Sequence, residues 1–66
     1  MTLHEAIIYV LKKKGNCTTR QIADDINRLK LYSRGDNEPI GTSQISARIN
    51  EYPHLFNREG RIIKLK

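Results

Sequence analysis

Residues 42–52, TSQISARINEY, combine an apolar stripe with an opposite face of small and amide side chains. Ile45, Ile49 and Tyr52 recur at the i, i+4 and i+7 spacing of one helical face, which predicts an amphipathic helix. The side chains expected to point away from that stripe are Ser43, Gln44, Ala47 and Asn50. Serine and amide groups can hydrogen-bond base edges, and alanine leaves room for a thymine methyl. Solvated helix faces usually carry charged residues, so this face is a candidate for contacting nucleic-acid bases.

Basic residues form a second set of candidates, because they can neutralise the phosphates of a nucleic acid. Arg48 lies at the flank of the apolar stripe, where it would reach a phosphate rather than a base. The start of the middle helix can also bind a phosphate through its free N–H groups. The candidates at that helix start and at the expected C-terminal hairpin are Thr19, Arg20, Arg58, Arg61 and Lys64.

Each of these features also has an ordinary structural explanation. The polar face of residues 42–52 could be a plain helix surface. Capping alone explains the threonines at the start of the middle helix. Exposed lysines and arginines on a hairpin protect its edges from aggregation. Lysines 12–14 match a solvated helix end, where the helix dipole favours cations.

The chain is short and basic. It has 66 residues, with 12 Lys and Arg against 7 Asp and Glu, a formal net charge of +5 and a pI near 9.7. A pI above about 9 is typical of nucleic-acid-binding domains, although a merely soluble basic protein shares it. This length predicts one domain over residues 1–66, a candidate module of a longer protein. Its small core leaves little room for a catalytic cleft, so we do not expect an enzyme.

Few residues could carry metal or redox chemistry. Cys17 is the single cysteine and is expected to be a small buried apolar residue. Together with His4 and His54 it makes no zinc-binding pattern, so we expect no metal, no cofactor and no catalytic residue. No apolar run approaches the roughly 18 residues that cross a membrane, and the start lacks the basic region of a signal peptide. The expected location is the cytoplasm, on the nucleoid.

Local signals predict two helices before the 42–52 segment. Thr2-x-x-Glu5 and Thr18-x-x-Gln21 match capping boxes, which predicts helices over 3–14 and 19–30. Gly15 is a suitable C-cap for the first helix. The inner face of the second helix is expected to contain Ile22, Ala23, Ile26 and Leu29, with Asp24 and Asp25 on its outer side.

Residues 31–41 connect the second helix to the third and contain the turn formers Gly35, Asp36, Asn37 and Pro39. Within this connector, Leu31, Tyr32 and Ile40 are expected to fold back on the core. The third helix is predicted to be capped by Thr42 or Ser43 and to end before Pro53.

The remaining residues predict a hairpin. A strand is expected to begin at Leu55, with a turn at 57–60 in which Gly60 supplies a positive φ, and a return strand at 61–66. Alternation does not decide which of Ile62 and Ile63 points inward. The predicted fold is mainly α with a small β-hairpin, a winged helix-turn-helix of three helices and a two-stranded wing, because such a hairpin must pack on the helices to be stable.

Several segments carry a family resemblance across nearly the whole chain. They are TLHEAIIYVLKKKGN, TTRQIADDIN, LYSR and, most specifically, SQISARI followed by YPHLF. Together they resemble the HARE-HTH domain of restriction endonucleases, additional-sex-combs-like chromatin proteins and the delta subunit of bacterial RNA polymerase. The resemblance implies a winged-helix fold that docks an attached domain onto DNA, and it brings no catalytic residue. This chain departs from the family in its short wing and in having no nuclease domain.

We therefore expect a DNA-binding module that docks an attached or associated nuclease, regulator or RNA polymerase component onto double-stranded DNA. Contact with four to six phosphates would make the affinity strongly salt-dependent. The alternative is a protein-interaction module that uses an apolar rim around Tyr32, Ile40 and Tyr52. Acidic Glu51 and Glu59 border the expected DNA face and favour the alternative, whereas the basic balance of residues 53–66 favours DNA.

Overall fold

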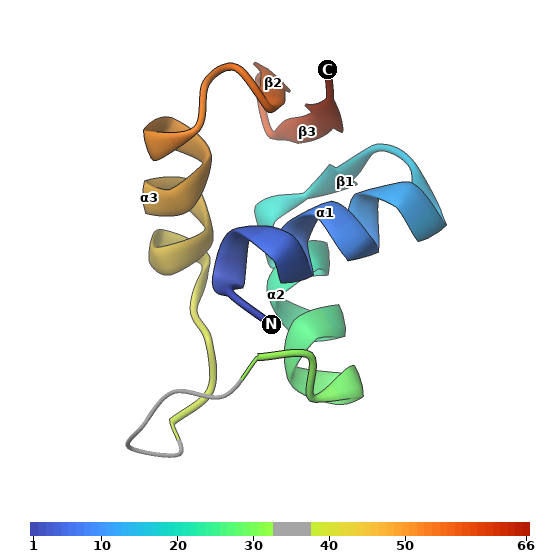
Figure 1. Cartoon of the computed structure of the whole chain (residues 1–66), viewed down its shortest axis with the longest axis vertical. Helices are drawn as coiled ribbons and strands as arrows, with labels where there is room; N and C mark the ends of the chain where they lie inside the picture. Colours follow the sequence, from blue (N-terminus) through green and yellow to red (C-terminus); the bar gives the residue numbers. More distant parts are fainter. Residues whose placement is uncertain (33–37) are drawn as a thin grey trace.

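The computed structural model describes residues 1–32 and 38–66. Three helices, α1 (Leu3–Lys14), α2 (Thr19–Leu29) and α3 (Thr42–Glu51), surround the core, and a small sheet lies at one end of them (Figure 1). The strands are β1 (Cys17–Thr18), β2 (Phe56–Glu59) and β3 (Ile62–Leu65). The prediction of a mainly helical fold with a small hairpin is confirmed. The turn formers predicted at 35–37 lie outside the described residues.

The first two helices begin where their capping boxes predict. The Thr2 backbone N–H donates to Glu5 Oε1 at 2.8 Å, and the Glu5 N–H donates to the Thr2 hydroxyl at 3.3 Å. At the start of α2 the Thr18 N–H donates to Gln21 Oε1 at 2.9 Å, and the Gln21 N–H donates to the Thr18 hydroxyl at 3.2 Å. Gly15 ends α1 with a φ of 84°, a conformation that glycine adopts without steric cost.

The sheet differs from the predicted two-stranded wing. β1 adds a third strand, giving an antiparallel sheet in the order β1-β3-β2. Cys17 and Thr18, which follow α1, pair with Ile63 and Ile62 of β3. This pairing gives hydrogen-bond partners to backbone N–H and C=O groups that would otherwise lack them beside the core. The hairpin is thereby attached to the helical part of the fold by hydrogen bonds as well as by packing.

The hairpin turn also lies later in the chain than predicted. Residues 57–59 belong to β2, and the turn is Gly60–Arg61, between Glu59 and Ile62. Gly60 has a φ of 58° as predicted, and Arg61 is not among the residues with positive φ, the pattern of a type II′ turn. A two-residue turn of this kind matches the twist of the strands, which explains why it replaces the longer predicted turn.

The core combines the inner faces of all three helices with the sheet. Ile63 is the inward residue of β3, fully buried, and Cys17 is buried at 2% exposure as expected. Leu31, Tyr32 and Ile40 pack on the core, which confirms that the connector folds back at both ends. Leu29 was predicted to face inward but is 37% exposed, because it is in the last turn of α2, beyond the surface that α1 and α3 cover.

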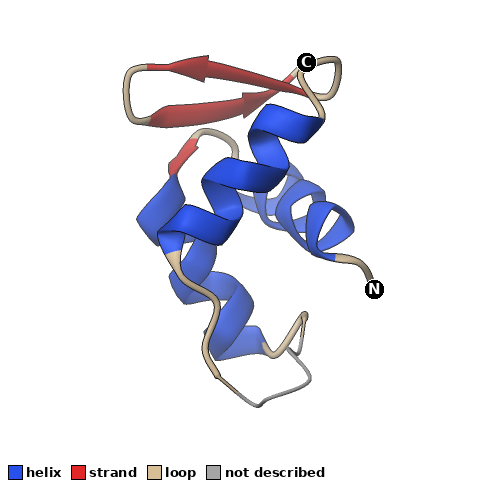
Figure 2. Ribbon diagram, turned by 90° about the vertical axis from the view of Figure 1, so that its left-hand side faces the viewer, coloured by secondary structure: helices blue, strands red, loops and turns tan. Residues whose placement is uncertain are grey.

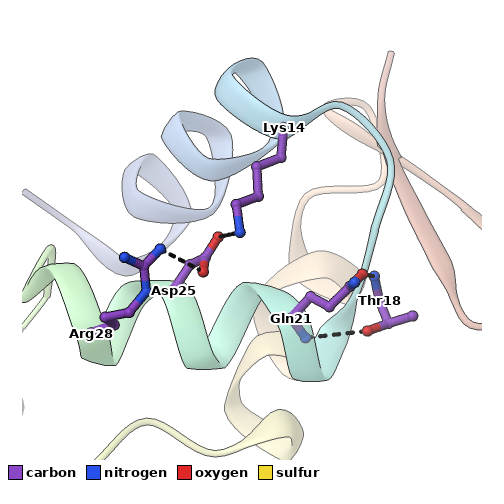
Figure 3. Close-up of polar contacts among 5 residues, drawn as sticks. All are labelled: Lys14, Thr18, Gln21, Asp25 and Arg28. Carbon is purple, nitrogen blue, oxygen red and sulfur yellow. Dashed lines mark hydrogen bonds and ion pairs between the residues drawn. The ribbon is translucent and has the colours of Figure 1, made fainter.

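Asp25 was predicted on the outer side of α2 and is buried, with 5% exposure. Its carboxylate pairs with Lys14 Nζ at 2.6 Å and with Arg28 Nη2 at 3.2 Å (Figure 3). Lys14 reaches it from the last turn of α1, so this lysine has an ion-pair partner in addition to its exposure to solvent. Burial of a carboxylate requires such compensation. Arg28 supplies part of it from the same helix, at the i+3 position, whereas Lys14 comes from another helix and is outside the local pattern of α2.

The start of α3 is held by amide side chains. Asn27 of α2 forms two bonds with the Ile40 backbone: Nδ2 donates to the carbonyl oxygen and Oδ1 accepts from the N–H, both at 2.9 Å. The N-cap of α3 is Gly41, not the predicted Thr42 or Ser43. Because glycine has no side chain to accept a hydrogen bond, the cap relies on Gln44 Oε1, which accepts the Gly41 N–H at 2.9 Å.

Candidate nucleic-acid interface

The outward face of α3 is exposed and free of charge at its centre. Ser43, Ala47 and Asn50 are all exposed, as the sequence predicts. Gln44 is half-buried, and its carbonyl oxygen is used in the helix cap described above. A bidentate contact with adenine needs both the oxygen and the nitrogen of the amide, so Gln44 would have to release the cap to make it. Ser43, Ala47 and Asn50 can contact a base without releasing a helix cap.

The hairpin lies against the edge of this face. Arg58 Nη2 donates to the hydroxyl of Ser46, which is on α3, at 2.8 Å. The sheet register explains the contact: Arg58 pairs with Ile63, and residues directly opposite in an antiparallel pair point to the same side. Since Ile63 points into the core, Arg58 also extends toward the helices. Ser46 precedes Ala47 and is one helical turn from Asn50 and Ser43, so the guanidinium borders the exposed face.

A cleft of about 370 Å³ lies between the hairpin and the start of α2. Figure 2 shows why the hairpin and the start of α2 lie close together. The short strand β1 leads directly into α2, and it is also hydrogen-bonded to strand β3 of the hairpin. Basic residues of α2 and of the hairpin therefore line one cleft, although these two elements are far apart in sequence. The cleft is lined by Thr18, Thr19, Arg20, Arg58, Gly60 and Arg61.

The predicted basic residues differ in whether they are already paired. Lys64 Nζ contacts Glu59 Oε2 at 3.1 Å, and Arg48 Nη1 contacts Glu51 Oε1 at 2.9 Å. Both acidic residues that were expected to repel phosphate are thus compensated locally. In the part of the chain that the structure describes, Arg20 and Arg61 make no ion pair. Among the candidate cations of this interface, those without an ion pair therefore lie at the cleft.

The opposite flank of α3 has a different character. A groove of about 470 Å³ there is lined by Met1, Thr2, Leu3, His4, Tyr32, Arg48, Glu51 and Tyr52. His4 stacks on Tyr52 with a centroid distance of 4.4 Å, and His54 lies on the same tyrosine at 6.1 Å. The predicted apolar rim must be corrected, because Ile40 is 4% exposed and belongs to the core. Arg48 lines this groove, on a different flank from the hairpin.

Sequence reasoning missed Ser46 and Gly60 as parts of the candidate site. Ser46 is only one residue from the apolar stripe, so the helical pattern gave no reason to assign it a partner. The signal is tertiary: it depends on the register that places Arg58 opposite Ile63. Gly60 was recognised as a turn residue, but its position beside Arg20 follows from the pairing of β1 with β3.

The described residues contain no group of His, Cys, Asp and Glu side chains placed to hold a metal ion. None of the helices over the described ranges is both long and apolar enough to span a bilayer. Burial raises the pKa of the Cys17 thiol, which disfavours the reactive thiolate. Comparisons with protein-family models, with curated proteins and with solved structures give no match.

Proposed function

We propose that this chain is a DNA-binding winged-helix domain of the HARE-HTH type, which docks an attached enzyme or regulator onto duplex DNA. The observation that carries the proposal is the bond between Arg58 and Ser46, because it joins the basic hairpin to the uncharged outer face of α3. A polyanion that places bases against α3 would thereby meet cations at the same edge. Such a module would act in the cytoplasm on nucleoid DNA, with a nuclease or an RNA polymerase component as its associated activity.

In this proposal α3 enters the major groove and its exposed side chains contact base edges. Ser43 and Asn50 can donate and accept hydrogen bonds, while Ala47 allows close approach. Gln44 contributes through its Nε2 group unless it releases the Gly41 cap. Arg48 and Lys64 have a smaller role than the sequence predicted, because each already contacts a carboxylate.

The proposal is tested by adding a mixed-sequence duplex to the ¹⁵N-labelled domain at low salt and following amide shifts. We expect shifts clustered at residues 43–50 and 58–61. Asn50→Ala should change the order of affinities among duplexes of different sequence, whereas Arg61→Ala should weaken all duplexes alike. The absence of any shift at low salt would contradict DNA binding, and equal uniform losses from both variants would remove Asn50 as a base contact.

The groove on the other flank supports protein interaction as a second candidate function. It combines the His4–Tyr52 stack with the half-buried Tyr32, a composition suited to a peptide side chain. Shifts confined to His4, Tyr32 and Tyr52 on addition of a partner protein would favour this function. The duplex titration and the partner-protein titration therefore separate the two candidate functions by which ligand causes shifts and by which flank of α3 responds.

A further inference from the structure

The cleft between the start of α2 and the β2–β3 hairpin has the composition of an anion site. Its three arginines come from two parts of the chain: Arg20 is in the first turn of α2, and Arg58 and Arg61 are in the hairpin, in β2 and in the turn. Among the described residues, no carboxylate lines the cleft. Guanidinium groups offer planar, multiple N–H donors that match the oxygens of a phosphate. Like charges brought together without an acidic partner cost free energy unless an anion joins them.

The nearby acidic residues do not supply that anion. Glu59, which precedes the hairpin turn, contacts Lys64. On α2, Asp25 is held by Lys14 and Arg28, and Asp24 makes no ion pair with Arg20 within the described residues, although it lies one helical turn further on. The positive charge of the cleft is thus available to a ligand from solution.

The start of α2 is not the source of this capacity. Two of the backbone donors there are already used in the capping box, where Thr18 and Gln21 bond each other's N–H groups (Figure 3). An anion in the cleft would therefore be held mainly by the guanidinium groups, with the Thr19 hydroxyl and the remaining N–H groups of the first turn as further donors. Within the described residues 1–32 and 38–66, the lining contains no aromatic or apolar side chain that could hold a sugar or a base. The cleft therefore suits a phosphate group of a larger ligand, the rest of which contacts another part of the protein.

Arg58 connects the cleft to α3. Its Nη2 group is engaged with Ser46, and an arginine side chain has five N–H donors, so others remain for an anion. The bond to Ser46 fixes the direction of the guanidinium while leaving part of it open to the cleft. Ser46 is therefore a positioning residue: it acts on a ligand through Arg58.

We propose that this cleft binds one backbone phosphate of duplex DNA, with Arg20, Arg58 and Arg61 as its ligands and Ser46 orienting Arg58. The inference rests on the proposed DNA-binding function and adds to it a single phosphate that sets the position of α3 along the groove. A duplex is favoured over a free phosphate compound because the cleft offers nothing to hold an organic group and lies beside the exposed face of α3.

The test is a methylphosphonate scan, in which one neutral phosphate analogue is placed at each backbone position of a short duplex in turn. We expect one position, or two adjacent ones, to lower the affinity about tenfold, with small effects elsewhere. Arg61→Ala should cause a similar loss on the fully charged duplex and little further loss on the duplex modified at that position. Lys12→Ala, which removes the same charge from the exposed outer side of α1, is the matched control.

Ser46→Ala should lower affinity about two- to fivefold on the unmodified duplex and have no effect on the duplex modified at the critical position or in an Arg58→Ala background. Ser46→Thr, which retains the hydroxyl, should restore most of the affinity. An additive loss in both settings would overturn the positioning role, because it would show that Ser46 acts independently of the phosphate.

The outcomes separate this inference from the proposed function. A flat scan with normal duplex binding, or an Arg61→Ala loss no larger than that of Lys12→Ala, overturns the phosphate site and leaves DNA binding intact. The absence of duplex binding overturns the proposed function itself. Inorganic phosphate should displace the duplex only at high millimolar concentrations; binding of inorganic phosphate alone below one millimolar would overturn the assignment to a DNA backbone.

Discussion

At the scale of single residues, Asp25 shows how a charge can be accommodated in a core this small. The Lys14 ammonium, and secondarily the Arg28 guanidinium, hold the pKa of this carboxyl below its ordinary value of 3.8, against the opposing effect of burial. Both cations are partly exposed, with side-chain exposures of 45% and 64%, so solvent weakens their attraction. The pair nevertheless links the end of α1 to the middle of α2.

Replacing Asp25 with asparagine should lower the free energy of unfolding at neutral pH by about 1–2 kcal/mol, because both cations lose their partner. For a domain of this size that corresponds to a fall in Tm of roughly 4–16 °C. Because the folded pKa is depressed, the stabilisation is fully present above the unfolded pKa and is lost as the pH falls through the folded value. Thermal unfolding should therefore show the gap between wild type and variant closing below about pH 4.

Asp24→Asn is the matched control, since Asp24 is exposed and carries no ion pair in the described parts of the chain. This variant should be close to wild type in stability at every pH. An equal loss of stability from both aspartates would refute the role given to the buried pair.

At the scale of elements, the position of α3 depends on two amide side chains. Asn27 makes the two bonds that an adjacent strand would make to Ile40, and Gln44 then caps the helix that follows. Ile40 is 4% exposed, so its backbone groups cannot easily exchange these bonds for water. The connector between α2 and α3 is thus tied to α2 immediately before the helix that carries the candidate base contacts.

Asn27→Ala should destabilise the domain by about 1–3 kcal/mol, because it leaves a buried N–H and a buried carbonyl without partners. The protection of the Ile40 amide against hydrogen exchange should fall by more than that of amides in α1. Asn16→Ala removes the same side chain from an exposed position and serves as the control. Unchanged Ile40 protection in Asn27→Ala would show that the connector is held by packing alone.

At the scale of the whole molecule, the features predicted from the sequence are those with local causes. The boundaries of α1 and the start of α2 follow from Thr2-x-x-Glu5 and Thr18-x-x-Gln21, whose partners are three residues apart. The start of α3 was misplaced because Thr42 and Ser43 are better capping residues than Gly41 by side-chain chemistry alone. The actual N-cap is Gly41, whose N–H donates to the side chain of Gln44, the third residue of the helix. Local sequence preferences favour this arrangement less than a serine or threonine cap.

Features that depend on contacts between distant segments could not be predicted. The burial of Asp25 requires a lysine from another helix, and the third strand requires Cys17 to lie beside Ile63. The candidate site divides in the same way. The exposed face of α3 follows from helical periodicity, whereas the contact of Arg58 with Ser46 depends on the register of β2 and β3. That register also decides which cations remain unpaired.

The number of unpaired cations at the interface leads to a prediction about salt. Lys64 and Arg48 are paired with carboxylates, so the cations expected to meet phosphates are Arg20, Arg58 and Arg61. Because these three guanidinium groups converge on one phosphate, we expect a slope of about −0.9 for log affinity against log salt, instead of a slope near −4 to −5 for the four to six contacts expected from composition.

Fluorescence anisotropy with a labelled duplex over a range of salt concentrations measures this slope. Arg61→Ala should make the slope less steep, because it weakens the hold on that phosphate, whereas Glu59→Gln should make the slope steeper by about one phosphate equivalent, because Lys64 would then be released to contact DNA. A slope of about −2 or steeper for the wild type would mean that cations outside the cleft, such as Arg48 or Lys64, also contact phosphates on binding. A slope near zero would contradict an electrostatic interface altogether, since the charge that gathers between α2 and the hairpin would then have no part in binding.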